Sequence, residues 1–207
     1  MTKSVLWGVE TAAQQLAQEV MGAVPSTLAS VALWDQPSFA LTVKAVSTAR
    51  PLSPPVTVGA RVPLSQAPWH RWVFEHQEPV LLDQASPGRT MSREEADLAL
   101  VPELRTIFLV PIRVAGEIVG ILTLGEMRSP GREPFGADKQ HQCLAALEQA
   151  IETSAQAWEA GRLRRQVRLM STLVQIVRHM LQARSYEDIL ATLGAKVSDW
   201  LGAPVRG

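Results

Sequence analysis

Two apolar segments that are separated by only two residues constrain the fold of this chain most. Residues 105–114 and 117–127 are dominated by aliphatic and β-branched side chains, and Ala115-Gly116 lies between them. A two-residue connection joins antiparallel strands, and glycine adopts the positive φ that such a turn requires. We therefore predict a central β-hairpin that helices cover. The core residues predicted in it are Phe108, Val110, Ile118 and Leu122.

Shorter patterned segments precede this hairpin. Residues 8–23 carry apolar side chains at the i, i+3, i+4 spacing of an amphipathic helix. Two β-rich segments then predict an antiparallel pair of strands, and a stretch with three prolines predicts a loop. In chain order, the remaining predicted elements are strands over 28–35 and 39–47, a loop over 48–60, a short helix over 68–76 with Ser65 as its cap, a strand over 79–83, and a polar segment over 84–103 with a helical turn at 94–97.

The most periodic part of the chain begins at Asp138, which is predicted to open a long helix. One apolar face runs up to Trp158, and a second stripe follows from Leu163 at spacings of 4, 3, 4, 3 and 4 residues, which is the seam of a coiled coil. The step between the two stripes is five residues, and Gly161 lies in the gap, so two packings could exchange there. The predicted dimer interface consists of Ile151, Trp158, Leu163, Val167, Met170, Val174, Val177 and Leu181.

The hairpin and the helix after it resemble the C-terminal half of a GAF domain. The residues that carry the likeness are Val110, Pro111, Gly116, Val119, Gly120, Leu122 and Leu124. Residues 63–84 match as well, as the short helix of the family and the strand that follows it, so the resemblance covers residues 8–160. It implies an α+β fold, a GAF-like antiparallel sheet of five to six strands with flanking helices, followed by a long coiled-coil linker helix.

The resemblance also divides the chain into parts. Residues 1–160 are predicted to form a GAF domain with its entry and exit helices, and residues 161–184 a coiled-coil linker helix. Residues 173–205 resemble the entry helices of another GAF domain, cut off where its first strand should begin. Residues 185–207 are therefore predicted to be the entry helix of a second, truncated GAF domain, which makes the chain the N-terminal part of a tandem GAF signalling protein.

In the family pattern, the short helix covers a ligand pocket on the sheet. The predicted ligand-binding residues are Trp34, Trp69, His70, Trp72, Phe74 and Phe108. Trp69 and Trp72 are three residues apart and share a helix face. Only one face of a strand can point to the pocket, so Trp34 and Phe108 need not both reach it. The alternative is that the tryptophans fill the cavity and leave the pocket closed.

The sequence offers little for catalysis or for a cofactor. The chain has no asparagine, so it lacks the Asn-Lys-x-Phe-Asp-Glu set that holds cyclic nucleotides in related GAF domains. Its single cysteine, Cys143, falls on the predicted exit helix rather than where bilin-binding relatives carry theirs, and one thiol cannot form the intramolecular disulfide of a sulfoxide reductase. There is no haem signature, and His70 and His76 are six residues apart, on different helix faces. We therefore predict a non-enzyme without a metal or cofactor.

Charge and hydropathy bear on partners and location. The chain has 20 basic and 20 acidic side chains, so no net field attracts nucleic acid or an anionic membrane. The arginines at 162, 164, 165 and 168 are predicted to flank the coiled coil and to pair with acids of the partner helix. No apolar stretch has the roughly 18 residues of a membrane span. A single cysteine favours the reducing cytoplasm.

These observations converge on a bacterial-style signalling protein. We predict a cytoplasmic, non-catalytic sensor module that binds an unknown small ligand, forms a homodimer through its exit helix and acts on a downstream output domain. The alternative is a purely structural dimerisation scaffold whose pocket is filled. Neither nucleic acid nor a membrane is expected as a partner.

Overall fold

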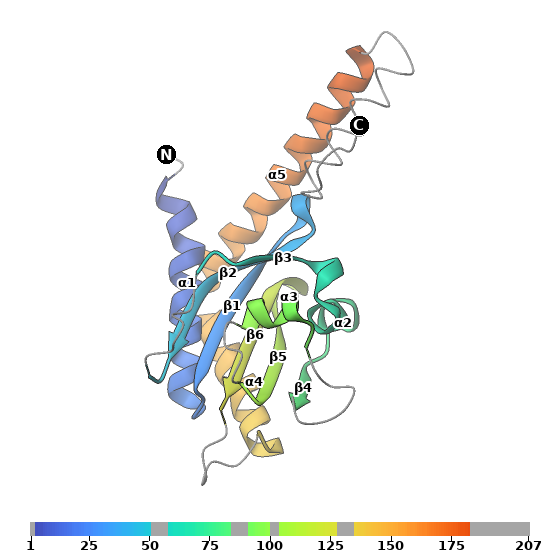
Figure 1. Ribbon diagram of the computed structural model, residues 1–207. Helices are drawn as coiled ribbons and strands as arrows, with labels where there is room; N and C mark the ends of the chain where they lie inside the picture. The colour runs from blue at the N-terminus through green and yellow to red at the C-terminus, as the bar shows by residue number, and fades with distance from the viewer. Residues whose placement is uncertain (1–2, 51–57, 84–90, 100–103, 128–134, 183–207) are drawn as a thin grey trace.

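The computed structural model describes residues 3–50, 58–83, 91–99, 104–127 and 135–182. It contains a six-stranded antiparallel sheet in the order β3-β2-β1-β6-β5-β4, which confirms the predicted α+β fold (Figure 1). The strands are β1 (Leu28–Asp35), β2 (Ala40–Thr48), β3 (Arg61–Pro63), β4 (Val80–Asp83), β5 (Thr106–Val114) and β6 (Glu117–Glu126). The helices are α1 (Lys3–Ala23), α2 (Pro68–His76), α3 (Arg93–Ala99), α4 (Ala137–Thr153) and α5 (Ala155–Gln182), with 3-10 turns η1 (Gln36–Ser38) and η2 (Leu64–Gln66).

The predicted hairpin is β5 and β6, and β6 lies in the middle of the sheet between β1 and β5. Its two-residue turn uses a positive φ at both positions, 51° at Ala115 and 80° at Gly116. Such a turn matches the twist of the paired strands, which is why a glycine is placed there. Alanine at the first position adopts the same left-handed region at some cost in strain.

Three of the four predicted core residues of the hairpin are buried, and the fourth is not. Phe108, Val110 and Leu122 are almost fully buried, whereas Ile118 is only half-buried. The register shifts between Ile112 and Arg113, so that Ile118 pairs with the exposed Arg113. Val119 takes the core position instead.

The sheet separates two apolar cores because successive strand residues point to opposite faces. The α1-side core lies between the sheet and α1, α4 and the start of α5, and it includes Leu16, Val31, Phe108, Leu122, Leu147 and Trp158. The α2-side core lies on the opposite face, toward α2 and α3, and it includes Leu28, Trp34, Leu41, Val73, Leu98 and Ile121. Figure 1 shows the two groups of helices on their respective sides of the sheet.

Several predicted boundaries need correction. The prediction missed a short edge strand, β3, that directly follows the loop predicted over 48–60. Pro63 is tolerated in it because an edge strand leaves backbone groups unpaired. Ala67 rather than Ser65 is the N-cap of α2, and Gly136 rather than Asp138 is the N-cap of α4. The helical turn predicted at 94–97 is the centre of α3.

The long helix predicted from Asp138 is in fact two helices that meet at Ser154. The Ser154 hydroxyl donates to the Ala150 carbonyl at 2.7 Å and accepts a hydrogen bond from Trp158 Nε1 at 2.9 Å. Serine back-bonding of this kind bends helices. The bend turns Trp158 into the α1-side core, where its side chain is fully buried, so it lies inside its own chain and not on the exposed stripe that it was predicted to join.

Gly161 marks a close crossing of α1 and α5. The glycine is buried, and a Cβ placed on it would overlap the side chain of Val9 on α1. The irregular step in the apolar stripe therefore has a steric origin: the residue that faces α1 must be small. Beyond this crossing, α5 extends past the sheet (Figure 1).

The crossing predicts an inverted response to alanine. Alanine normally stabilises a helix by about 1 kcal/mol over glycine, and Gly22→Ala should do so because it has open space on α1. Gly161→Ala should instead destabilise the fold, by roughly 1–3 kcal/mol, because of the overlap with Val9. The double variant Val9→Ala, Gly161→Ala should regain part of that loss. Urea denaturation measures the free energy of unfolding of these three variants and of the parent. A Gly161→Ala protein that is as stable as Gly22→Ala would disprove the close crossing.

Candidate functional site

The start of α2 is held by a carboxylate from another helix. The N-cap residue, Ala67, has no side-chain hydrogen bond to offer to the free N–H groups of the first turn. The backbone N–H of His70 instead donates to Glu95 Oε1 of α3 at 2.7 Å. A carboxylate is well suited to this position because it also opposes the positive end of the helix dipole.

The same carboxylate oxygen contacts the His70 ring. His70 Nδ1 lies 2.9 Å from Glu95 Oε1, and both side chains are fully buried. The ring nitrogen on the other side, His70 Nε2, has no hydrogen-bond partner among the described residues, and neither has Glu95 Oε2. A buried polar atom without a partner costs about 1–3 kcal/mol. The pair is therefore a polar site with unused hydrogen-bonding capacity inside an apolar layer.

Ser92 fixes the orientation of Glu95. Its hydroxyl accepts a hydrogen bond from the Glu95 N–H at 3.1 Å and donates one to the Gln66 carbonyl at 3.2 Å. In a capping box, the glutamate three residues after the serine turns back to the serine N–H. Here it points to α2 instead. Glu95 of α3 and Ser92, which directly precedes α3, thus tie that helix to the start of α2 and to the η2 turn before it.

Aromatic side chains surround the start and the end of α2. Trp34 of β1 meets Phe74 with ring centroids 4.7 Å apart, and it meets the exposed Phe39 edge-on at 5.9 Å. Trp72 stacks on His76 at 4.4 Å, which places His76 away from His70. Trp69 and Trp72 are half-buried, and both pack against the α2-side core.

Five of the six predicted ligand residues thus gather on the α2 side of the sheet, and Phe108 does not. Phe108 belongs to the α1-side core, where its ring lies 6.1 Å from that of Phe135. Strand alternation sends it to the opposite face from Trp34. The prediction missed Glu95, although Ser92 and Glu95 have the spacing of a capping box that marks a helix start.

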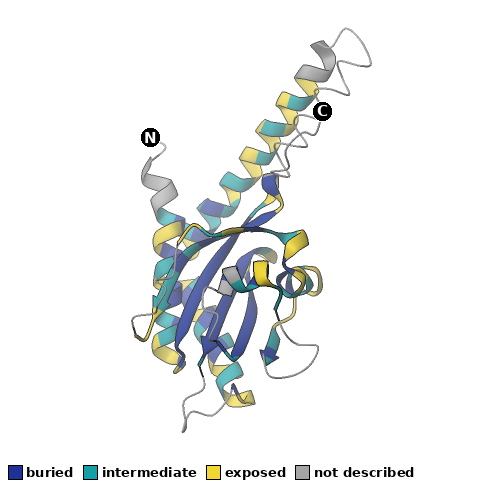
Figure 2. Cartoon of the chain, viewed as in Figure 1, coloured by how far each residue is buried: buried dark blue, intermediate teal, exposed yellow. Residues whose placement is uncertain are grey.

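The stripe predicted as a dimer interface is exposed along most of α5. Five of its residues have between 48% and 68% of their surface exposed, and Figure 2 shows this part of α5 as a run of exposed and half-buried residues. These five are Leu163, Val167, Met170, Val174 and Val177. Ile151 is half-buried against the α1-side core, and the side chain of Leu181 lies outside the described residues. No helix in the described ranges is long and apolar enough to cross a membrane.

A groove connects this stripe to the predicted ligand residues. It has a volume of about 1040 Å³ and runs between α5 and the end of the sheet. Trp34, Phe74 and Ile118 line one wall, and the stripe residues from Leu163 to Val174 line the other. The half-exposed position of Ile118 is thereby explained, because its side chain lines the groove rather than a core.

Cys143 is buried in the α1-side core. Burial raises the pKa of its thiol to about 12, so the thiol stays protonated near neutral pH. Within the part of the chain that the structure covers, no three histidine, cysteine or acidic side chains are grouped as metal ligands.

Comparisons with known proteins agree with this architecture. The GAF domain family model matches residues 9–158. The match covers one GAF domain, and residues 185–207, which were predicted to begin a second, lie outside the described residues. No curated protein matches the sequence significantly.

Solved structures share the fold at low sequence identity. A GAF/HD domain protein from Geobacter sulfurreducens is 14% identical with a TM-score of 0.57, over 72% of this chain and 94% of that one. The GAF domain of a two-component sensor histidine kinase from Bacillus halodurans is 18% identical with a TM-score of 0.56, over 75% and 97%. A type II free methionine-R-sulfoxide reductase from Thermoplasma acidophilum is 13% identical with a TM-score of 0.53, over 72% and 96%.

At such identities the likeness shows the fold alone, and the reductase among them shows that this fold also serves enzymes. The family match spans most of the chain, and the sheet order, the helical layers and the described elements agree with it. The chain therefore belongs to the GAF domain family.

Proposed function

We propose that this chain is a non-catalytic regulatory module that binds a small ligand beside α2 and α3 and passes the signal to an output domain through a dimer formed along α5. GAF domains are typical of sensor and signalling proteins. The observation that carries the proposal is the exposed apolar stripe on α5, because a helix that leaves its domain with such a face needs a partner.

The spacing of the stripe favours a second copy of the same helix as that partner. Residues repeat at alternating steps of four and three from Leu163 to Val177, so both helices can interlock along one seam. Helices in water depend largely on packing for their stability, and the apolar stripe of α5 past Gly161 is exposed in the single chain. A homodimer supplies that packing without any other protein.

The ligand part of the proposal rests on the unpaired atoms of His70 and Glu95. A ligand that donates N–H or O–H groups would satisfy Glu95 Oε2 and, with Nδ1 protonated, His70 Nε2. The tryptophans of α2 and Trp34 supply flat apolar surface beside this pair. The chemistry fits a small, partly planar molecule with polar hydrogens.

A change on the α2 side of the sheet can reach α5 through the groove between them. Trp34 and Phe74 pack on each other on the ligand side, and both also line the groove along the stripe. A ligand that shifts either ring changes the wall that faces α5. Catalysis by a thiol is disfavoured in this scheme because the one cysteine of the chain is buried and protonated.

The structural scaffold stays the second candidate, and one observation favours it. The α2 face is occupied by its own rings, with Trp34 against Phe74 and both tryptophans of α2 against the core. In that case dimerisation is the whole function and the unpaired atoms of His70 and Glu95 are a tolerated cost.

The dimer is tested by placing a charge in the stripe. Val174→Asp should convert the dimer to a monomer in sedimentation velocity. Burying a carboxylate in an interface without water costs roughly several kcal/mol of association free energy unless the group is neutralised. Thr172→Asp is the matched control, since it adds the same charge to the half-buried position on the far side of α5 and should remain dimeric. A parent protein that sediments as a monomer at high concentration would refute the dimer.

The ligand site is tested by a thermal-shift screen of small planar molecules with polar hydrogens. A ligand of the α2 face raises the melting temperature as its concentration exceeds Kd. The rise should be lost in Glu95→Gln, which changes the acceptor, and retained in Glu94→Gln, a neighbouring exposed position on α3. A hit that stabilises both variants equally places the ligand elsewhere, and a screen without hits favours the scaffold.

A further inference from the structure

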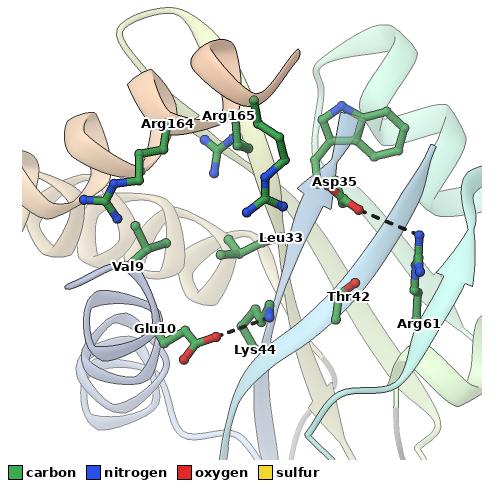
Figure 3. Close-up of a pocket in the computed structure, with 12 residues that line it drawn as sticks. Val9, Glu10, Leu33, Asp35, Thr42, Lys44, Arg61, Arg164 and Arg165 are labelled. Carbon is green, nitrogen blue, oxygen red and sulfur yellow. Dashed lines mark hydrogen bonds and ion pairs between the residues drawn. The ribbon is translucent and has the colours of Figure 1, made fainter. Parts of the chain in front are cut away.

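A second pocket adjoins the groove on the α1 side of the sheet, between α1, the ends of β1 and β2, the edge strand β3, and α5 (Figure 3). Its volume is about 380 Å³, which is within the range of small-molecule sites of roughly 300–1,000 Å³. Gly161, the crossing point of α1 and α5, forms part of its wall. None of its residues comes from α2 or α3.

Positive charge dominates this pocket. The five cationic side chains in its lining are Lys44, Arg61, Arg164, Arg165 and Arg168. The lining itself has two carboxylates: Glu10 pairs with Lys44 at 3.2 Å, and Asp35 pairs with Arg61 at 3.7 Å. Figure 3 shows both pairs at the strand side of the pocket, while Arg164 and Arg165 project from α5 above them.

The three arginines of α5 are left without such partners. No ion pair is recorded for Arg164, Arg165 or Arg168 within the described ranges. The neighbouring Arg162, by contrast, pairs with Glu117 at 3.2 Å and with Glu159 at 2.7 Å. Three positive charges in one small concave site attract an anion strongly, because the low-dielectric walls focus their field.

Arg165 has the hydrogen-bonding group that points most specifically to a ligand site. Its Nη2 atom is buried and has no hydrogen-bond partner among the described residues. Burial lowers the pKa of Arg165. The attraction of Glu117 opposes this shift, the repulsion of Arg162 adds to it, and the attraction of Asp35 opposes it more weakly. A guanidinium that has lost water needs an acceptor, and its planar fork matches the oxygens of phosphate.

We propose that this pocket binds a small phosphate-type anion, held by Arg164, Arg165 and Arg168 against the end of the sheet. The apolar part of its wall includes Val9, Leu33 and Trp34, so the pocket also accommodates the organic part of a phosphate ester. The site differs from the His70–Glu95 site in charge and in its polar residues, and the two sites have only Trp34 in common. It stands whether or not the chain dimerises, because every lining group belongs to one chain.

Occupancy of the pocket would fasten α5 to the domain. The anion would join arginines on α5 to a wall built by α1 and the sheet, next to the close crossing at Gly161. Anion binding is thereby linked to the position of the helix that carries the exposed stripe.

Isothermal titration calorimetry of the full chain with inorganic pyrophosphate and with a nucleoside monophosphate, at constant ionic strength, tests the site. We expect saturable binding of at least one of them. The double variant Arg165→Gln, Arg168→Gln should weaken it at least tenfold, since it removes two positively charged hydrogen-bond donors from the pocket. Arg178→Gln is the control, because it removes the same charge from an exposed position of α5 outside the pocket and should bind as the parent does.

Two results would overturn the proposal. One is equal weakening in Arg178→Gln and in the double variant, which indicates a general effect of charge. The other is a double variant that binds pyrophosphate and the nucleotide normally but alters the sedimentation of the dimer, which shows that the arginines pair with carboxylates of a second chain. If the nucleotide binds more tightly than pyrophosphate, its organic part contacts the apolar wall and the ligand is a phosphate ester. If pyrophosphate binds more tightly, the ligand is a free inorganic phosphate.

Discussion

The packing of α5 on α1 is the contact on which the rest of the structure depends. Trp158 is pinned in the α1-side core by Ser154, and one turn later Gly161 lets Val9 approach the helix backbone. These two residues fix where α5 touches the domain and where it leaves it. They also fix which side of the helix carries the exposed stripe, since rotation about the helix axis would bring a bulky residue against Val9.

The sheet places two polar sites on opposite faces, and α5 is near both. On the α2 side, Glu95 serves as the cap of α2 and as the partner of His70, so hydrogen bonds tie α3 to the start of α2. On the α1 side, the arginines of α5 form part of the cationic pocket itself. Trp34 and Arg165 line both the groove and the pocket, so the end of β1 and the start of α5 border both cavities.

Local patterns predicted the fold well where sequence neighbours decide the structure. The Ala115-Gly116 hairpin and the bounds of α2 follow from turn chemistry and helical spacing. Contacts between distant residues decided the rest. The face of Phe108 depends on strand register, the crossing at Gly161 depends on Val9 of α1, and the cap of α2 depends on a glutamate 25 residues from His70. The cationic pocket was invisible for the same reason: the arginines were recognised as a run, but α1 and the sheet supply the walls.

In this account, α1 and the sheet hold the start of α5, and a second copy of the chain stabilises the rest of this helix. Hydrogen–deuterium exchange along α5 tests this central claim most directly. It is measured above and below the concentration at which the dimer dissociates. Amides of residues 155–162 should be protected equally at both concentrations, because Trp158 and Gly161 are buried in one chain. Amides of residues 163–182 should gain protection only in the dimer. Protection of 163–182 that does not change with concentration, or a concentration effect on the sheet instead, would contradict the account.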